Sequence, residues 1–293
     1  MAGGETMSDL PVDCNGCPLG WAEPYEDRDG LVAESYDLAP PPAVFTAPEF
    51  LDPREHLRVE DQGRIGSCSG NATTTVEELV AFYQTGQRHE FSRMGAYLAA
   101  QKIDGLLGRD AGATISGQAR RAKQYGTAPE SVFPYPTAYT ATIPDAYWAA
   151  AEVRQTRSTT KLRSYQEVFD FLARGIGGVV IGIPWKASLA NAQSGVIEQS
   201  SGQNYGGHAL AIIGYLPASK GGRSDRQGRP YLIMQNSHGL RWANKGCALI
   251  APPLFDEWGR DGYSEMIGFS DMENPNDENF VSRWWTGDRH PLA

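Results

Sequence analysis

Most of the clear helical spacing in this sequence lies in the first 130 residues, and this uneven distribution is the feature that most constrains the fold. Apolar residues recur every three or four positions from Val76 to Tyr83, which predicts an amphipathic helix that starts near Cys68. Similar patterns predict helices over residues 92–103 and 116–125, and Gly126 follows the second in the position that a helix C-terminus favours.

Strand-like runs fill most of the second half. Short apolar or β-branched runs bounded by Gly, Pro and Asn predict strands at residues 179–183, 208–215, 231–235 and 247–250. One short helix precedes them, because Ser164 and Glu167 form a capping box and the helical pattern ends at Gly175. A helical region followed by a β-rich region predicts an α+β fold with a cleft between the two parts.

Composition divides the 293 residues into three parts. Residues 1–45 lack periodicity and contain Cys14, Cys17 and the proline run 40–42, so we interpret them as an N-terminal extension with a CxxC motif. Residues 46–270 have a globular pattern and form the predicted domain. Residues 271–293, which include Trp284 and Trp285, are predicted to be a C-terminal tail that wraps the surface or binds a partner.

The charge and hydropathy of the chain argue against two classes of partner. The formal net charge is -9, with 35 acidic and 26 basic residues, and no concentrated Lys/Arg block is present, which disfavours nucleic-acid binding. The longest apolar stretches, 179–183 and 209–213, are strand-sized and too short to span a bilayer. Because no signal or transit peptide is readable, we expect a cytoplasmic or virion-associated protein without a membrane partner.

Cys68 is the first candidate for chemistry. It sits at the start of a predicted helix, where the helix dipole lowers the pKa of a thiol and makes it more nucleophilic. Gly66, Ser67 and Gly70 surround it with small residues that let a substrate backbone approach. A buried, inert thiol is the alternative interpretation.

Three polar residues could complete a site with Cys68. His208 opens a predicted strand after two glycines, where it could exchange protons near neutral pH. Asn236 follows another strand and could orient that imidazole, while Gln62 could donate its side-chain N–H to an oxyanion. Each of these residues taken alone is equally consistent with a strand end or a turn.

The order of these residues resembles that of a known family. The blocks around Gln62 to Cys68, Gly207 to Leu210 and Asn236 to Gly239 resemble the three signature blocks of papain-like cysteine peptidases, in the same order. The resemblance extends over about 210 residues, and within them the sequence is similar to bacterial and viral members of the family. Asn236 lies later than usual, which a loop insertion at residues 219–229 explains.

The resemblance implies the papain-like two-lobed fold, with a helical N-terminal lobe, an antiparallel β-rich C-terminal lobe and the active site between them. It implies hydrolysis of peptide bonds in a protein or peptide substrate through a thioester, without a cofactor. The residues to which it assigns roles are Cys68 as nucleophile, His208 as base and acid, Asn236 as its orienting partner, Gln62 as oxyanion donor, and Gly112, Ala113, Gly207 and His238 as substrate-binding residues.

Three positions depart from the family pattern. Ile65 replaces the usual cysteine, so the common disulfide there is absent, and Ser69 replaces the aromatic residue after the nucleophile. His238 replaces the tryptophan that shields the asparagine; it could titrate in the site or stack in the same place.

Cys14 and Cys17 form a single CxxC motif, which is half of a zinc site or a small disulfide loop, and no second ligand pair is evident. No metal is therefore expected, and these two cysteines are the only weak candidates as ligands. Cys247 is predicted to be a core residue.

Several functional alternatives stay open at this point. The same residues serve related Cys-His amidases and acyl transferases, and a catalytically idle papain-like structural or virion component is the alternative from another class. We expect residues 1–45 to be a docking extension, because they lack the long helical pattern of an inhibitory pro-segment.

Overall fold

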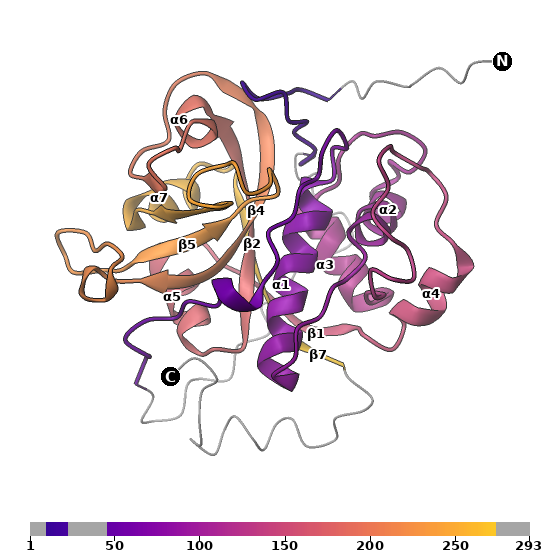
Figure 1. Ribbon diagram of the computed structural model, residues 1–293, viewed down its shortest axis with the longest axis horizontal. Helices are drawn as coiled ribbons and strands as arrows, with labels where there is room; N and C mark the ends of the chain where they lie inside the picture. Colours follow the sequence, from indigo (N-terminus) through magenta and orange to yellow (C-terminus); the bar gives the residue numbers. More distant parts are fainter. Residues whose placement is uncertain (1–9, 23–45, 274–293) are drawn as a thin grey trace.

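Helix α1 (Cys68–Thr85) is the element against which both halves of the chain pack. The computed structural model of the protein describes residues 10–22 and 46–273. Helices cover one side of α1 and a β-sheet covers the other, as Figure 1 shows. Nearly every residue of α1 is buried as a result, and the helix ends at Gly86, whose φ of 70° suits a residue without a side chain.

The helical lobe consists of α2 (Arg93–Asp104), α3 (Ile115–Gln124) and α4 (Asp145–Ala151). The hydroxyl groups of Ser92 and Thr114 cap α2 and α3 by accepting hydrogen bonds from backbone N–H groups in the first turn. A buried ion pair fastens α3 to α1, since Arg121 Nη1 lies 3.0 Å from Glu77 Oε1 and both side chains are 0% exposed. The lobe is therefore held on the central helix by charge as well as by apolar packing.

One sheet forms the other lobe among the described residues. Its seven strands follow the order β1-β7-β2-β4-β5-β6-β3, and all neighbouring pairs are antiparallel except β3 with β6. Their bounds are β1 Thr156–Lys161, β2 Gly177–Lys186, β3 Val196–Ile197, β4 Asn204–Leu216, β5 Tyr231–Gln235, β6 Cys247–Ile250 and β7 Glu265–Met272. β2 and β4 are buried along most of their length, because α1 packs against these two strands on one face of the sheet and α5 packs against them on the other. Strands that are covered on both faces have nearly continuous apolar sequences.

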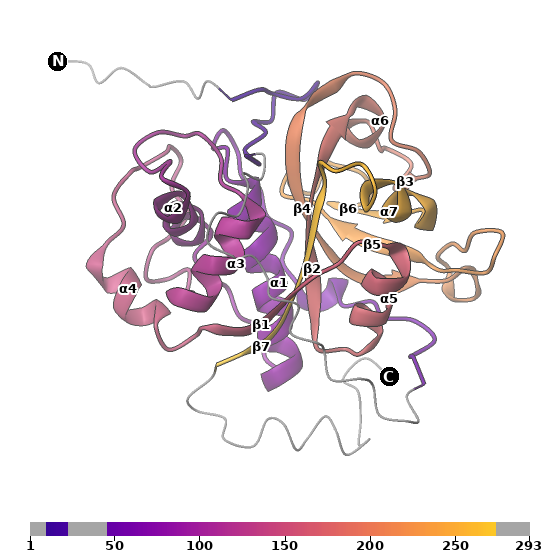
Figure 2. The same cartoon turned by 180° about the vertical axis from the view of Figure 1, so that it is seen from behind.

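Short elements close the remaining sides of the sheet. Figure 2 shows α5 (Tyr165–Ala173) and α7 (Pro252–Trp258) on the far side of the strands from α1, and α6 (Ala187–Ala190) follows β2 directly. Two 3₁₀ turns, η1 (Arg54–His56) and η2 (Ala218–Lys220), lie in connections. Within the described ranges, no helix is long and apolar enough to cross a membrane.

The α+β fold predicted from the sequence is confirmed. The strands predicted at 231–235 and 247–250 match β5 and β6, and the helices predicted at 92–103 and 116–125 differ from α2 and α3 by one residue at each end. The helix predicted to start near Cys68 begins at Cys68. β1, β3, β7, α4, α6 and α7 were not predicted. β7 also runs to Met272, two residues into the region assigned to the tail, whereas Trp284, Trp285 and prolines 40–42 lie outside the described residues.

Candidate active site

Cys68 is the first residue of α1 and is 0% exposed. The backbone amides of Ala209, Gly20 and Ser69 face its sulfur and favour the thiolate, as the helix N-terminus does. Because Ala209 follows His208 in β4, the contact places the thiol beside the strand that carries the histidine.

His208 and Asn236 lie together as predicted. His208 Nε2 is 2.8 Å from Asn236 Oδ1, and that oxygen also accepts a hydrogen bond from the Ser237 backbone N–H at 2.8 Å. Since an amide oxygen only accepts, Nε2 carries the proton and the neutral ring keeps its basic lone pair on Nδ1. Nδ1 has no hydrogen-bond partner among the described residues. His208 itself stands four residues inside β4, paired with Ile183, rather than at the strand's first residue.

Gln62 is buried and has both ends of its amide engaged. Its Oε1 accepts a 2.6 Å hydrogen bond from Ser237 Oγ, which fixes the orientation of the amide. Its Nε2 donates to the carbonyl oxygens of Ile65 at 3.0 Å and Pro18 at 2.9 Å. The side-chain N–H of Gln62, which was expected to bind an oxyanion, therefore binds the backbone carbonyl of Pro18.

Burial shifts the pKa values of both central groups toward their neutral forms. It raises the pKa of the Cys68 thiol to about 11, against the effect of the surrounding amides. Burial, followed by the neighbouring His238 ring, holds the pKa of His208 well below its usual range, and Asn236 opposes that shift. In this conformation the pair is a neutral thiol and a neutral imidazole.

Residues 10–22, which we call the N-terminal segment, cover the site. In Figure 1 this segment is drawn in indigo at the upper end of α1, where the two lobes meet. Ala113 N–H donates to Gly20 O at 3.0 Å, and Ala22 N–H donates to Ala113 O at 3.3 Å, so Trp21 pairs with Ala113 as a parallel bridge. Backbone approaches backbone closely here, since a Cβ on Gly20 would overlap the carbonyl oxygen of Gly66.

Trp21 fills a recess over two glycines next to this bridge. Its indole lies where side chains on Gly182 and Gly207 would have to be, and it packs edge-on to Tyr263 with ring centroids 5.0 Å apart. A Cβ on Gly112 would likewise overlap the backbone of Gly20. Three of the predicted substrate-binding residues thus line the surface that the N-terminal segment occupies: Gly112, Ala113 and Gly207.

His238 lies beside the predicted triad. Its ring centroid is 4.6 Å from that of His208, and Trp185 is 4.6 Å from His208 on another side. The two imidazole rings are tilted by 37° to each other, and His238 also faces Asp13 of the N-terminal segment at 3.6 Å. Whether His238 titrates in the site or takes the place of the tryptophan stays a prediction.

The cysteines outside the triad differ from one another in their surroundings. Cys14 is exposed, and its thiol donates to Asn191 Oδ1 at 3.6 Å, whereas Cys17 lies close to His238. Cys247 is buried next to Gln235, in keeping with a core role.

Sequence reasoning did not find three residues that shape the site: Asp13, Trp21 and Trp185. The signal that was available is the run Pro18-Leu19-Gly20-Trp21, which is apolar within an acidic region.

Known proteins provide independent evidence on the family. The family model for the papain family of cysteine proteases matches residues 47–252. No curated protein sequence is significantly similar to the chain.

Solved structures share the fold. Xylellain, a cysteine protease from Xylella fastidiosa, is 19% identical with a TM-score of 0.63, and the match covers 92% of this chain and 98% of that one. Procathepsin L 3 of Tenebrio molitor is 19% identical with a TM-score of 0.64, covering 83% and 75%. Bromelain from Ananas comosus, solved with the E64 inhibitor, is 19% identical with a TM-score of 0.58, covering 76% and 99%.

The match to the family model extends over more than two thirds of the sequence and includes the residues around Cys68, His208 and Asn236. The chain therefore belongs to the papain family of cysteine proteases, and it is a hydrolase of the cysteine peptidase class.

Proposed function

We propose that the protein hydrolyses peptide bonds with Cys68 as nucleophile, His208 as general base and acid, and Asn236 as the residue that orients the imidazole. The observation that carries this proposal is the 2.8 Å contact between His208 Nε2 and Asn236 Oδ1. It leaves Nδ1 as the basic nitrogen of a ring on β4, one residue before Ala209, whose backbone amide faces the Cys68 sulfur.

The chemical steps follow from these roles. His208 Nδ1 takes the thiol proton, and the Cys68 sulfur attacks the substrate carbonyl carbon to form a tetrahedral oxyanion. Collapse of this intermediate breaks the C–N bond, and His208 gives the proton to the leaving amine, which leaves a thioester. His208 then deprotonates a water molecule, which attacks the thioester and releases the acid and the free thiol.

Gln62 is proposed to stabilise the oxyanion together with the Cys68 backbone N–H. Support comes from its 2.9 Å hydrogen bond to the Pro18 carbonyl oxygen, because the same N–H can bind a substrate oxygen once that segment leaves. The amide needs no reorientation, since Ser237 already holds its other end.

Substrates are proposed to bind as extended peptides along Ala113. The backbone N–H and C=O of this residue already bond to Gly20 and Ala22 of the N-terminal segment, in the manner of a short strand addition. Because the recess formed by Gly182 and Gly207 holds the indole of Trp21, we propose that it accepts a large apolar or aromatic substrate side chain.

The first test is covalent labelling with an epoxysuccinyl inhibitor, read by mass spectrometry. Cys68 should be labelled in the chain and not in His208→Ala, while buried Cys247 serves as an internal control. Labelling should be faster in Gly20→Ala, which forces the N-terminal segment off the site. If Cys14 reacts but Cys68 stays unlabelled in both the parent and Gly20→Ala, the interpretation as a catalytically idle structural protein replaces this proposal.

A second measurement separates hydrolysis from acyl transfer. Peptide cleavage in H₂¹⁸O should place one heavy oxygen in the new carboxyl group, because water attacks the thioester. Products joined to an added amine, without incorporation of heavy oxygen, would identify an acyl transferase instead.

A further inference from the structure

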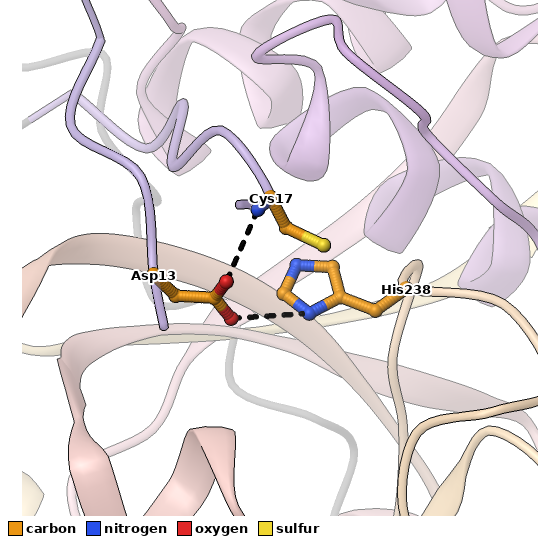
Figure 3. Close-up of side chains that lie close together, drawn as sticks. All are labelled: Asp13, Cys17 and His238. Carbon is orange, nitrogen blue, oxygen red and sulfur yellow. Dashed lines mark hydrogen bonds and ion pairs between the residues drawn. The ribbon is translucent and has the colours of Figure 1, made fainter. Parts of the chain in front are cut away.

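A second cluster of reactive side chains links the N-terminal segment to the domain. Asp13 and Cys17 come from the segment and His238 comes from the turn after β5, and Figure 3 shows the three side chains pointing toward one another. One ligand-type atom from each lies within 4.8 Å of the others. None of the chemistry proposed above uses Asp13 or Cys17.

The carboxylate of Asp13 is held in place from several sides. Its Oδ1 accepts hydrogen bonds from the backbone N–H groups of Asn15 at 2.8 Å and Cys17 at 3.1 Å. Its Oδ2 accepts from Trp185 Nε1 at 3.2 Å and faces His238 Nδ1 at 3.6 Å. These contacts fold residues 13–17 into a tight loop and aim the carboxylate at the histidine.

The imidazole of His238 lacks the partners that a buried polar ring requires. Its side chain is only 2% exposed, and neither ring nitrogen makes a hydrogen bond to any described residue. The 3.6 Å separation from Asp13 Oδ2 is too long for a hydrogen bond. Buried polar atoms are normally satisfied, so an unpartnered ring between a carboxylate and a thiol calls for a ligand.

We propose that Asp13, Cys17 and His238 bind a divalent zinc-type cation, and that this ion fastens the N-terminal segment over the active site. Oxygen, sulfur and nitrogen donors in one cluster are the set that Zn²⁺ prefers. A water molecule can supply the fourth ligand of a tetrahedral site.

The placement of the ligands gives the ion a regulatory effect. Two ligands belong to the segment that covers Cys68 and one belongs to the domain, so the ion binds the covered conformation better than the uncovered one. This regulatory part rests on the proposed peptidase function, whereas metal binding itself does not.

Metal binding is tested in full-length Cys68→Ala protein, which removes the catalytic thiol as a competing ligand. Titration with Zn²⁺ by calorimetry, and with Co²⁺ for its thiolate charge-transfer absorption, should show about one ion per chain. Adding Asp13→Asn or Cys17→Ser should weaken binding at least ~10-fold, and Cys17→Ser should also abolish the charge-transfer band.

Cys14→Ser is the matched control, since Cys14 belongs to the same CxxC motif but bonds to Asn191. It should bind like the parent. Equal binding in Cys14→Ser and Cys17→Ser, or a Cys14–Cys17 disulfide in the purified protein, would overturn the site.

Regulation is tested with the catalytic thiol present. Zn²⁺ should lower peptide turnover and a chelator should raise it in the parent, and Cys17→Ser should respond to neither. If Zn²⁺ inhibits Cys17→Ser as strongly as the parent, it acts at Cys68 and His208 and the fastening role is wrong. Labelling of Cys68 by the epoxysuccinyl inhibitor tests the peptidase proposal independently of the metal site.

Discussion

Replacing Gly20 with alanine should activate the enzyme. Gly20 has an ordinary backbone conformation, so the substitution is not opposed by φ. Its difficulty is space, because the new Cβ would overlap the Gly66 carbonyl group and lie 2.7 Å from Gly66 Cα. Both obstacles are backbone atoms at the loop before Cys68, which cannot rotate away as a side chain can. The N-terminal segment must therefore lift off the site.

The size of the effect follows from the hydrogen bonds that this displacement breaks. Three fix the segment around Gly20: Ala113 N–H to Gly20 O, Ala22 N–H to Ala113 O, and Gln62 Nε2 to Pro18 O. Each of these hydrogen bonds stabilises the covered form by about 1 kcal/mol net. Losing all three therefore shifts the equilibrium between the covered and uncovered forms by about 3 kcal/mol toward the uncovered form. Since 1.4 kcal/mol corresponds to about tenfold, the uncovered population should rise about 100-fold, up to full opening.

The assay is kcat/KM for a fluorogenic peptide, together with the rate of inhibitor labelling at Cys68. Gly16→Asn is the matched control, because Gly16 lies in the same segment, is exposed, and has open space and a φ of 75° that asparagine tolerates. Gly20→Ala should be much faster than both the parent and Gly16→Asn. If all three proteins have the same turnover and labelling rate, the segment does not restrict access to the site.

Three further predictions concern single groups. In the Gly20→Ala protein, Gln62→Ala should lower kcat by about 10²- to 10³-fold; an unaltered kcat would remove Gln62 from the mechanism. Burial raises the pKa of the Cys68 thiol to about 11 in the covered form, so the stability that burial of the neutral thiol gives this form is lost as the pH rises through about 11. Iodoacetamide alkylation should therefore begin at lower pH in Gly20→Ala than in the parent, and coincident profiles would contradict this. Arg121→Met should destabilise the fold by about 3–5 kcal/mol because it leaves Glu77 buried and unpaired, and a chemical denaturation midpoint equal to that of the parent would show that the pair is unimportant.

Buried, uninterrupted apolar runs made part of the fold predictable. β5 and β6 were located to the residue because their runs are mostly apolar, with Pro230 and Asn236 on either side of β5 and Gly246 before β6. β1 was missed because Thr156–Lys161 is a polar edge strand, whose only neighbour in the sheet is β7. Its pairing depends on residues more than 100 positions away, and local patterns do not report such contacts.

The candidate site was predictable where chain order and chemistry coincide. Cys68, His208 and Asn236 come from three segments whose order matches the family, and the structure brings the last two into contact and the first beside them. Residues 1–45, which include the covering segment, were interpreted as a docking extension because they lack helical or strand periodicity. The segment can dock because Gly20 and Gly66 have no side chains and their backbones pack against each other. This contact forms only in the folded protein, so the residues on either side of each glycine in the sequence do not indicate it.

The register of the N-terminal segment explains how it can occupy the site without presenting a bond for cleavage. A scissile peptide must place one carbonyl so that its oxygen bonds to Gln62 while its carbon faces the Cys68 sulfur. In the segment these two roles fall on different residues: the carbonyl of Pro18 bonds to Gln62, and the backbone amide of Gly20 faces the sulfur. The thiol therefore meets a hydrogen-bond donor instead of an electrophilic carbon. Because the bridge of Trp21 to Ala113 and the loop at Asp13 fix the segment on both sides of the thiol, it cannot slide into a cleavable register without breaking one of them.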